Sequence, residues 1–309
     1  AWIIGFPIIF VVVFYMIVAH WREPGFSCLE PIGLNQFTAS MVALGVSLSL
    51  LATGYYATII EPNQVELSKI EIPIDLIPAK GRPIKIVQLS DLNIQTVGSR
   101  ERRALRIIND VQPDLILLTG NYAEDKGTGV EVNKFMKELR ASYGVYAVTG
   151  PRDTYPEYAK YFEGTSIQLI DDHALAVQID SVPVVLTGVS PNDASIKRGG
   201  VPFMMMDTDN SYVVMLSHSP SVKQFAPYTI DLILSGETMG GVVRLPFSGP
   251  LLKTSSVPAN EYHGVVRRPG SDSGLMYVTS GLGLFPGKTP RLRFLCPPEV
   301  ALITLTSAR

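Results

Sequence analysis

Two long uncharged stretches at the start of the chain constrain its fold more than any other feature. Residues 1–19 contain no charged side chain, and a second uncharged stretch lies between Glu30 and Glu61. A helix over residues 1–19 would be roughly 28 Å long, close to the thickness of the hydrocarbon core of a bilayer. The densest part of the second stretch is also long enough to span. We therefore predict a membrane anchor over residues 1–60, made of two transmembrane helices at about 1–21 and 36–60.

The residues around these stretches fit a bilayer. Trp21 follows the first stretch, and Tyr55 and Tyr56 lie near the end of the second, as aromatic side chains do at a membrane interface. Small residues inside the second stretch permit close helix–helix contact. A cleaved signal peptide and a buried soluble helical hairpin are the alternatives. A signal peptide would need a charged start and a small-residue cleavage site, and the first stretch has neither.

Composition agrees with a membrane part. Charged residues make up 17% of the chain, below the roughly 25% that is usual for soluble domains. The net charge of −2 and the lack of a long Lys/Arg run give no reason to expect a nucleic-acid partner. The two cysteines, Cys28 and Cys296, would lie on opposite sides of the membrane if both helices span it, so they do not report the redox compartment.

The rest of the chain has the pattern of an α/β domain. Residues 65–74 alternate between apolar and polar and predict a first strand, which Pro73 places at a sheet edge. Short apolar runs bounded by turn-forming residues then alternate with helical spacing at residues 100–111 and 130–140, and the later runs are mostly strands. This order predicts layers of helices and mixed sheets. We assign residues 61–83 to a linker and the first strand, and residues 84–309 to one domain.

Polar residues follow the predicted strands at the points where the strands end. The residues concerned are Asp91, Asn121, the turn Pro151–Asp153, His218 and the turn Glu237–Met239. Open α/β sheets place their functional sites beyond the carboxyl ends of the strands. We therefore expect these residues to converge on one rim of the domain.

The order of these motifs resembles the calcineurin-like metallophosphoesterase family, and in particular its membrane-attached bacterial branch. The family pattern is a strand followed by DxH, then GD, GNH(D/E), a strand ending in His, and GHTHGGQ. The corresponding blocks here read SDLN (90–93), TGN (119–121), GPRD (150–153), LSHSP (216–220) and SGETMGG (235–241). The resemblance covers about residues 62–309. It implies a four-layer αββα sandwich with two mixed sheets, and a location in a bacterial inner membrane with the side of the domain undetermined.

The resemblance also implies a two-metal phosphoesterase site, in which two ions activate a water and neutralise phosphoryl oxygens. Carried over by position, the first metal would take Asp91, Asn93, Asn121 and Met239. The second metal would share Asn121 and take Pro151, His218 and Glu237. Arg152 replaces an imidazole that assists the leaving group.

Most of these positions depart from the family residue. Asp91 and His218 agree with the pattern, but the shared carboxylate has become Asn121, Pro151 has no side-chain donor, and Met239 offers only a soft thioether. We therefore expect no metal cofactor, or at most one weakly bound divalent metal. We also expect a catalytically inactive protein with a structural or regulatory role beside other membrane-protein subunits.

Two other functions remain open. One is a residual metal-dependent hydrolase acting on phosphomonoesters or phosphodiesters. The other is a module in which Arg152 binds a phosphate ligand or a lipid headgroup, since Arg suits phosphate. A simpler role for Arg152 is an ion pair with Asp153 or Glu237 that replaces the charge of the metals.

Overall fold

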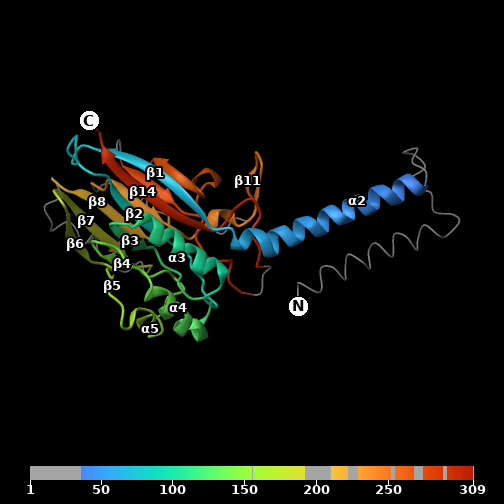
Figure 1. Ribbon diagram of the computed structural model, residues 1–309, viewed down its shortest axis with the longest axis horizontal. Helices are drawn as coiled ribbons and strands as arrows, with labels where there is room; N and C mark the ends of the chain where they lie inside the picture. Colours follow the sequence, from blue (N-terminus) through green and yellow to red (C-terminus); the bar gives the residue numbers. More distant parts are fainter. Residues whose placement is uncertain are drawn as a thin grey trace. The chain divides into compact units, whose positions relative to one another are not determined.

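The structure is a computed structural model of the 309-residue chain (Figure 1). It describes residues 36–154, 156–191, 210–221, 229–251, 255–267, 274–287 and 291–308. The chain divides into two compact units, Ala1–Ile60 and Glu61–Arg309. The first predicted transmembrane helix, at about 1–21, and Cys28 lie outside the described residues.

The first unit contains the second predicted membrane helix. Helix α2 (Gln36–Tyr55) contains no acidic residue in its first turn and no basic residue in its last, and a π-helical turn (Tyr56–Ile60) continues it. The segment Leu44–Asn63 is long and apolar enough to cross a membrane, with a mean hydropathy of 1.2. Its side chains include the exposed residues Val46 and Leu48. Length and composition therefore make this segment a candidate span.

The first sheet of the domain has six strands in the order β1-β14-β2-β3-β4-β5. Their bounds are β1 (Glu66–Ile74), β14 (Glu299–Ser307), β2 (Ile84–Leu89), β3 (Leu115–Leu118), β4 (Val145–Ala147) and β5 (Ile167–Leu169). Strands β2 to β5 are parallel, and β14 runs antiparallel to β2. Strand β1 is the edge strand predicted from Pro73, a residue that cannot donate a ladder hydrogen bond.

The second sheet is also mixed and six-stranded, in the order β12-β13-β9-β8-β7-β6. Its strands are β12 (Gly264–Arg267), β13 (Leu275–Val278), β9 (Leu232–Ser235), β8 (Tyr212–Ser217), β7 (Val182–Val189) and β6 (Ala174–Ile179). A separate hairpin joins β10 (Arg244–Leu245) to β11 (Gly249–Pro250). Two mixed sheets in one α/β domain confirm the predicted fold class.

The main core lies between the two sheets. Leu115 and Leu117 of β3 point into it and meet residues such as Leu186 of β7. The alternate residues of β3, Ile116 and Leu118, point the other way. Because successive side chains of a strand face opposite sides, one run of four apolar residues serves both faces of a buried sheet.

Helices cover the outer face of the first sheet (Figure 1). They are α3 (Ser99–Val111), α4 (Gly129–Met136) and α5 (Ala159–Phe162). Their buried residues, such as Ile108 and Phe135, pack in one cluster with β2 and β3. The helix predicted over residues 130–140 is shorter than expected, because the chain changes to tighter turn bonds from Glu138 to Phe135 and from Leu139 to Met136.

The outer face of the second sheet carries a third apolar cluster, which includes Val213, Met215 and Ile233. A fourth layer, as the predicted αββα order requires, would cover this face. Segments 192–209 and 222–228, which come before β8 and β9 in the chain, lie outside the described residues.

Candidate functional site

The candidate site lies where five strands end, as the sequence predicts. Asp91 follows β2, Asn121 follows β3 and His218 directly follows β8. Backbone hydrogen bonds join the loops: the Asp91 N–H donates to the Gly120 carbonyl at 2.9 Å. The parallel strands bring together residues that are far apart in the sequence, so the predicted convergence on one rim is correct for these loops.

Three buried side chains form the centre of the site. The Asn121 amide nitrogen lies 3.1 Å from Asp91 Oδ1 and 2.8 Å from His218 Nε2. The carboxylate and the imidazole themselves approach to 3.7 Å. All three side chains are at least nine-tenths buried. A neutral amide therefore bridges the two residues that agree with the family motif.

The hydrogen-bond partners fix the direction of each of these bonds. His218 Nδ1 lies 2.6 Å from the carbonyl oxygen of Thr119, which can only accept, so Nδ1 carries the proton. In the neutral ring Nε2 then accepts from the Asn121 amide. Asn121 Oδ1 accepts from the Arg152 N–H at 3.1 Å, so the amide group cannot be reversed without facing a donor with a donor. Each polar atom of this centre has a partner that matches it.

The other oxygen of Asp91 is also engaged. Asp91 Oδ2 accepts from the Ser90 hydroxyl at 2.8 Å and from the Glu237 backbone N–H at 3.0 Å. Glu237 therefore reaches Asp91 through its main chain, and its side chain is partly exposed. Three donors, the Asn121 amide, the Ser90 hydroxyl and the Glu237 backbone N–H, therefore engage both oxygens of the Asp91 carboxylate.

Asn93 and Met239 form a second, looser part of the site. Asn93 Nδ2 lies 3.9 Å from the sulfur of Met239, and both side chains are buried. The opposite atom of the amide, Asn93 Oδ1, is buried and has no hydrogen-bond partner. A buried acceptor without a partner carries a desolvation cost, so this oxygen is the position of the site most suited to receive a donor or a cation.

Arg152 does not form the ion pair expected from the sequence. Among the described residues, no ion pair joins it to Asp153 or Glu237; its guanidinium donates to the backbone carbonyl of Glu124 instead. Arg152 and Pro151 are both exposed. The expectation was wrong because the Asp153 carboxylate is already taken by backbone donors and lies inside the loop.

Asp153 organises the site, a role that the sequence did not reveal. Its carboxylate accepts from the backbone N–H groups of Asn121, Tyr122 and Gly150 at 2.6, 3.0 and 2.8 Å. Burial raises the pKa of Asp153 above its ordinary value, and the three N–H groups act in the opposite direction. The GPRD motif could have indicated this role of Asp153, because in it an acidic residue follows a glycine turn.

The loops of the site hold non-glycine residues in a disfavoured backbone conformation. Asp91, Asn93, Asn121, Glu237 and Met239 all have positive φ values, between 40° and 66°. Such conformations cost free energy for residues with a Cβ, and they persist where the surrounding structure over-determines them. The site is therefore a rigid arrangement of five strained positions.

Close backbone approach adds to this rigidity. A Cβ on Gly150 would lie 2.5 Å from Asn121 Oδ1, and a Cβ on Gly236 would lie 2.6 Å from Asp91 Oδ2. Both glycines are required by the space that the amide and the carboxylate occupy.

Comparison with known proteins shows what the chain is similar to. No protein-family model matches the chain. The chain is 27% identical over 303 residues to an uncharacterised metallophosphoesterase of Bacillus subtilis, YkuE, and the match covers 90% of this chain and 99% of that protein. The matched relatives support the calcineurin-like metallophosphoesterase family. The resemblance stated from the motifs is thereby confirmed.

Two other relatives have names that refer to a transmembrane protein and to a diacylated sugar nucleotide. One is a transmembrane protein with a metallophosphoesterase domain from Danio rerio, 23% identical over 84% of this chain and 61% of that protein. The other is UDP-2,3-diacylglucosamine pyrophosphatase LpxG of Chlamydia trachomatis, 23% identical over 85% of this chain and 98% of that protein. Together with the candidate span Leu44–Asn63, they indicate membrane association.

The side chains present do not fit the two-metal centre that the family implies. Two divalent ions need hard oxygen and imidazole ligands and a shared carboxylate. Here Asn121 directs N–H groups toward Asp91 and His218, and Pro151 and Met239 supply no hard ligand. Within the described ranges, no group of three or more His, Cys, Asp or Glu side chains is placed to hold a metal.

Proposed function

We propose that this protein is a membrane-anchored metallophosphoesterase homologue that does not catalyse two-metal hydrolysis and serves a structural or regulatory role. One observation carries the proposal: the Asn121 amide nitrogen lies within hydrogen-bond distance of both Asp91 and His218. It occupies the place where the family mechanism requires a negative oxygen between two ions.

A metal could use Asp91 and His218 together only if both of these hydrogen bonds broke. Turning the amide by 180° would present its oxygen to the metal, but it would also set the NH₂ group against the Arg152 N–H. The amide would still be neutral, so the charge repulsion between two dications would remain uncompensated. The arrangement therefore favours a metal-free site.

A residual hydrolase with a single divalent ion is the second candidate. Asn93 Oδ1 supports it, because this buried acceptor has no partner and lies beside Asp91 in the sequence and in the site. Such an ion would have to displace one of the groups that now satisfy the Asp91 carboxylate. The relative LpxG, a pyrophosphatase named for a diacylated sugar nucleotide, suggests a lipid-linked diphosphate as the substrate to try.

We further propose a two-span anchor at about 1–21 and 36–60, a bacterial inner membrane as the location, and a four-layer αββα domain. A role without catalysis requires a partner, and we propose other membrane-protein subunits. Gly45 and Gly54 support contact through the second span, because no atom lies within 4 Å of the position where either would carry a Cβ.

Metal content of the full-length protein tests the proposal. The protein, purified in mild detergent, is incubated with Mn²⁺ or Zn²⁺, passed through a desalting column and analysed by mass spectrometry of the elements. We expect no metal to remain bound. Two retained metals per chain would refute the proposal, and one retained metal would favour the second candidate.

Hydrolysis assays separate the two candidates further. The substrates are a generic phosphodiester and a lipid-linked diphosphate, and the matched variant is His218→Ala. Activity that disappears in the variant would establish a residual hydrolase. Activity that is unchanged in the variant would belong to a contaminating enzyme.

A further inference from the structure

The hairpin between β10 and β11 exposes a group of large apolar side chains. Leu245 is 40% exposed, Leu251 is 60% exposed and Phe247 at the tip is fully exposed. Leu295, on a neighbouring segment, is 46% exposed. We call these four residues the hairpin surface. Single exposed apolar residues are common, but a group of this size on two adjoining segments points to an interaction.

Hydrogen bonds hold the two segments together. The Arg244 N–H donates to the Phe294 carbonyl at 2.9 Å, and the Leu251 N–H donates to the Val243 carbonyl at 2.8 Å. Val243 and Phe294 form a parallel β-bridge. Leu295 therefore lies directly beside the hairpin, and the four side chains belong to one surface.

The hairpin surface is linked to the start of the domain. Glu61 is buried, and its carboxylate accepts from the backbone N–H groups of Leu295 and Cys296 at 2.9 and 2.5 Å. Glu61 lies within the last turns of the candidate span Leu44–Asn63. Charged hydrogen bonds of this kind are strong, so Leu295 is held beside Glu61, the residue at which the domain begins.

The backbone at the tip of the hairpin indicates that Phe247 is not there for the turn itself. Pro246 precedes Phe247, the φ of Phe247 is +69°, and the Ser248 N–H donates to the Leu245 carbonyl at 3.3 Å. In a turn of this form the third position favours Gly or Asn, because a Cβ is disfavoured at positive φ. The aromatic side chain is fully exposed at a position where the backbone disfavours it, so we infer that it serves an interaction and not the fold of the hairpin.

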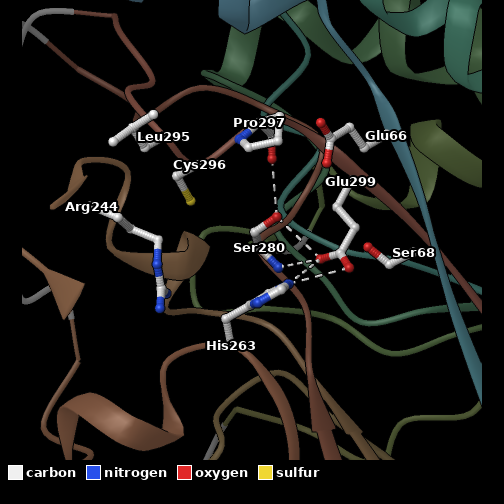
Figure 2. A pocket seen from close by; sticks show the side chains of 9 residues that line it. All are labelled: Glu66, Ser68, Arg244, His263, Ser280, Leu295, Cys296, Pro297 and Glu299. Carbon is white, nitrogen blue, oxygen red and sulfur yellow. Dashed lines mark hydrogen bonds and ion pairs between the residues drawn. The ribbon is translucent and has the colours of Figure 1, made fainter. Parts of the chain in front are cut away.

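One cation, Arg244, adjoins the hairpin surface. Arg244 and Leu295 line a cavity of about 160 Å³, together with His263 and the carboxylates of Glu66 and Glu299. Figure 2 shows Arg244 and Leu295 on one side of this cavity and Glu299 on the other. A cation beside apolar side chains matches the order of an interface, where anionic headgroups lie next to acyl chains.

We propose that the hairpin surface inserts into the same bilayer that holds the anchor, and that the phospholipid interface is its partner. The domain then has two attachments, the span that ends near Glu61 and the tip at Phe247. A second attachment restricts the rotation of the domain about the first. The proposal does not depend on whether the site binds metal.

A single-tryptophan experiment on the full chain tests this contact. The two native tryptophans are Trp2 and Trp21, so Trp2→Phe and Trp21→Phe remove the background emission. Phe247→Trp then places one indole at the tip, where full exposure leaves the fold undisturbed. The protein is reconstituted in vesicles of phosphatidylethanolamine and phosphatidylglycerol, with or without bromine on the upper acyl carbons. Insertion by about 5–10 Å would bring the indole to the bromines, and we expect its emission to fall severalfold.

Leu169→Trp in the same background is the matched control. Leu169 is an exposed apolar residue of β5, the edge strand opposite β1 in the first sheet. Five strand spacings separate β5 from β1, a distance of roughly 24 Å. We expect little quenching there. Adding Leu245→Asp and Leu251→Asp to the Phe247→Trp chain should restore most of the emission.

Two results would overturn the proposal. One is quenching at position 247 no greater than at position 169 in vesicles that contain only lipid, which would assign the surface to a protein partner. The other is strong quenching that persists in the chain with Leu245→Asp and Leu251→Asp, which would mean that the surface does not mediate the contact.

Discussion

Replacement of Asn121 by Asp tests the central arrangement most directly, because it restores the carboxylate of the family motif by changing one group. In the present structure the amide nitrogen donates to the Asp91 carboxylate at 3.1 Å and lies 2.8 Å from His218 Nε2. In Asn121→Asp an oxygen would stand at that place, facing one carboxylate oxygen and one ring nitrogen that already acts as an acceptor.

The expected cost follows from these contacts. A hydrogen bond to a charged group contributes about 1.5–3 kcal/mol and one between neutral groups about 0.5–1.5 kcal/mol. Their loss gives a destabilisation of about 2–4.5 kcal/mol, before repulsion between the two carboxylates is included. The pKa of the new carboxyl should be raised in the folded state by its neighbour Asp91. The penalty should therefore grow as pH rises from below the unfolded-state pKa toward neutrality.

Calorimetry of the full-length chain in detergent measures this effect. Tryptophan fluorescence would not report on the domain, because the two tryptophans lie at positions 2 and 21. We expect a lower unfolding temperature for Asn121→Asp in EDTA and a partial recovery in Mn²⁺. Metal at a hundred times its dissociation constant adds about 2.7 kcal/mol of stability, and the wild-type chain should gain almost none.

Asn109→Asp is the matched control, since it makes the same chemical change at an exposed position of α3. Its effect should stay within about 0.5 kcal/mol. The reasoning is wrong if Asn121→Asp is as stable as the wild type in EDTA, or if Mn²⁺ stabilises the wild type as much as the variant.

Two further changes test the surroundings of the site. Gly236→Ala would push a methyl group against the Ser90 hydroxyl and to 2.6 Å from Asp91 Oδ2. We therefore expect calorimetry to show a loss of about 1–3 kcal/mol in the free energy of unfolding. An unchanged unfolding temperature would contradict the packing described. Burial acts to raise the pKa of Glu299, but its hydrogen bond with His263 and the charge of that ring contribute to a net lowering. Because a lowered pKa stabilises the folded state above the unfolded-state pKa, the stability of the wild type should fall as pH drops from about 4.5. The variant Glu299→Gln should be less stable at pH 7, and its stability in urea titrations should depend less on acid pH. Parallel pH profiles for the two chains would exclude this role of Glu299.

The sequence predicts the strands that lead to the site because each is a short, mainly apolar run that ends in a polar residue. It does not predict β5, β6 or β12, whose residues are largely exposed or only partly buried. The edge position of β1 could be predicted because Pro73 excludes a central strand. The end of α4 could not, since the change to tighter turns after Met136 depends on local backbone geometry that the periodic pattern does not contain.

For the candidate site, residue types alone determine which chemistry is missing. Proline has no side-chain donor, a thioether is a soft ligand and a carboxamide carries no charge, whatever the fold around Pro151, Met239 and Asn121. The sequence therefore excludes a complete set of family ligands without any coordinates. The sequence also shows that position 152 carries a cation, but it does not predict which group Arg152 contacts, and the expected ion pair was wrong.

Only the tertiary structure decides what the replaced side chains do. The direction of the Asn121 amide depends on Asp91, Arg152 and His218, which lie 30, 31 and 97 positions away in the chain. The same holds for Asp153, whose carboxylate turns inward because three backbone N–H groups converge there. A hydrogen bond needs two atoms at a defined distance and angle, and only the folding of the two sheets brings these loops together.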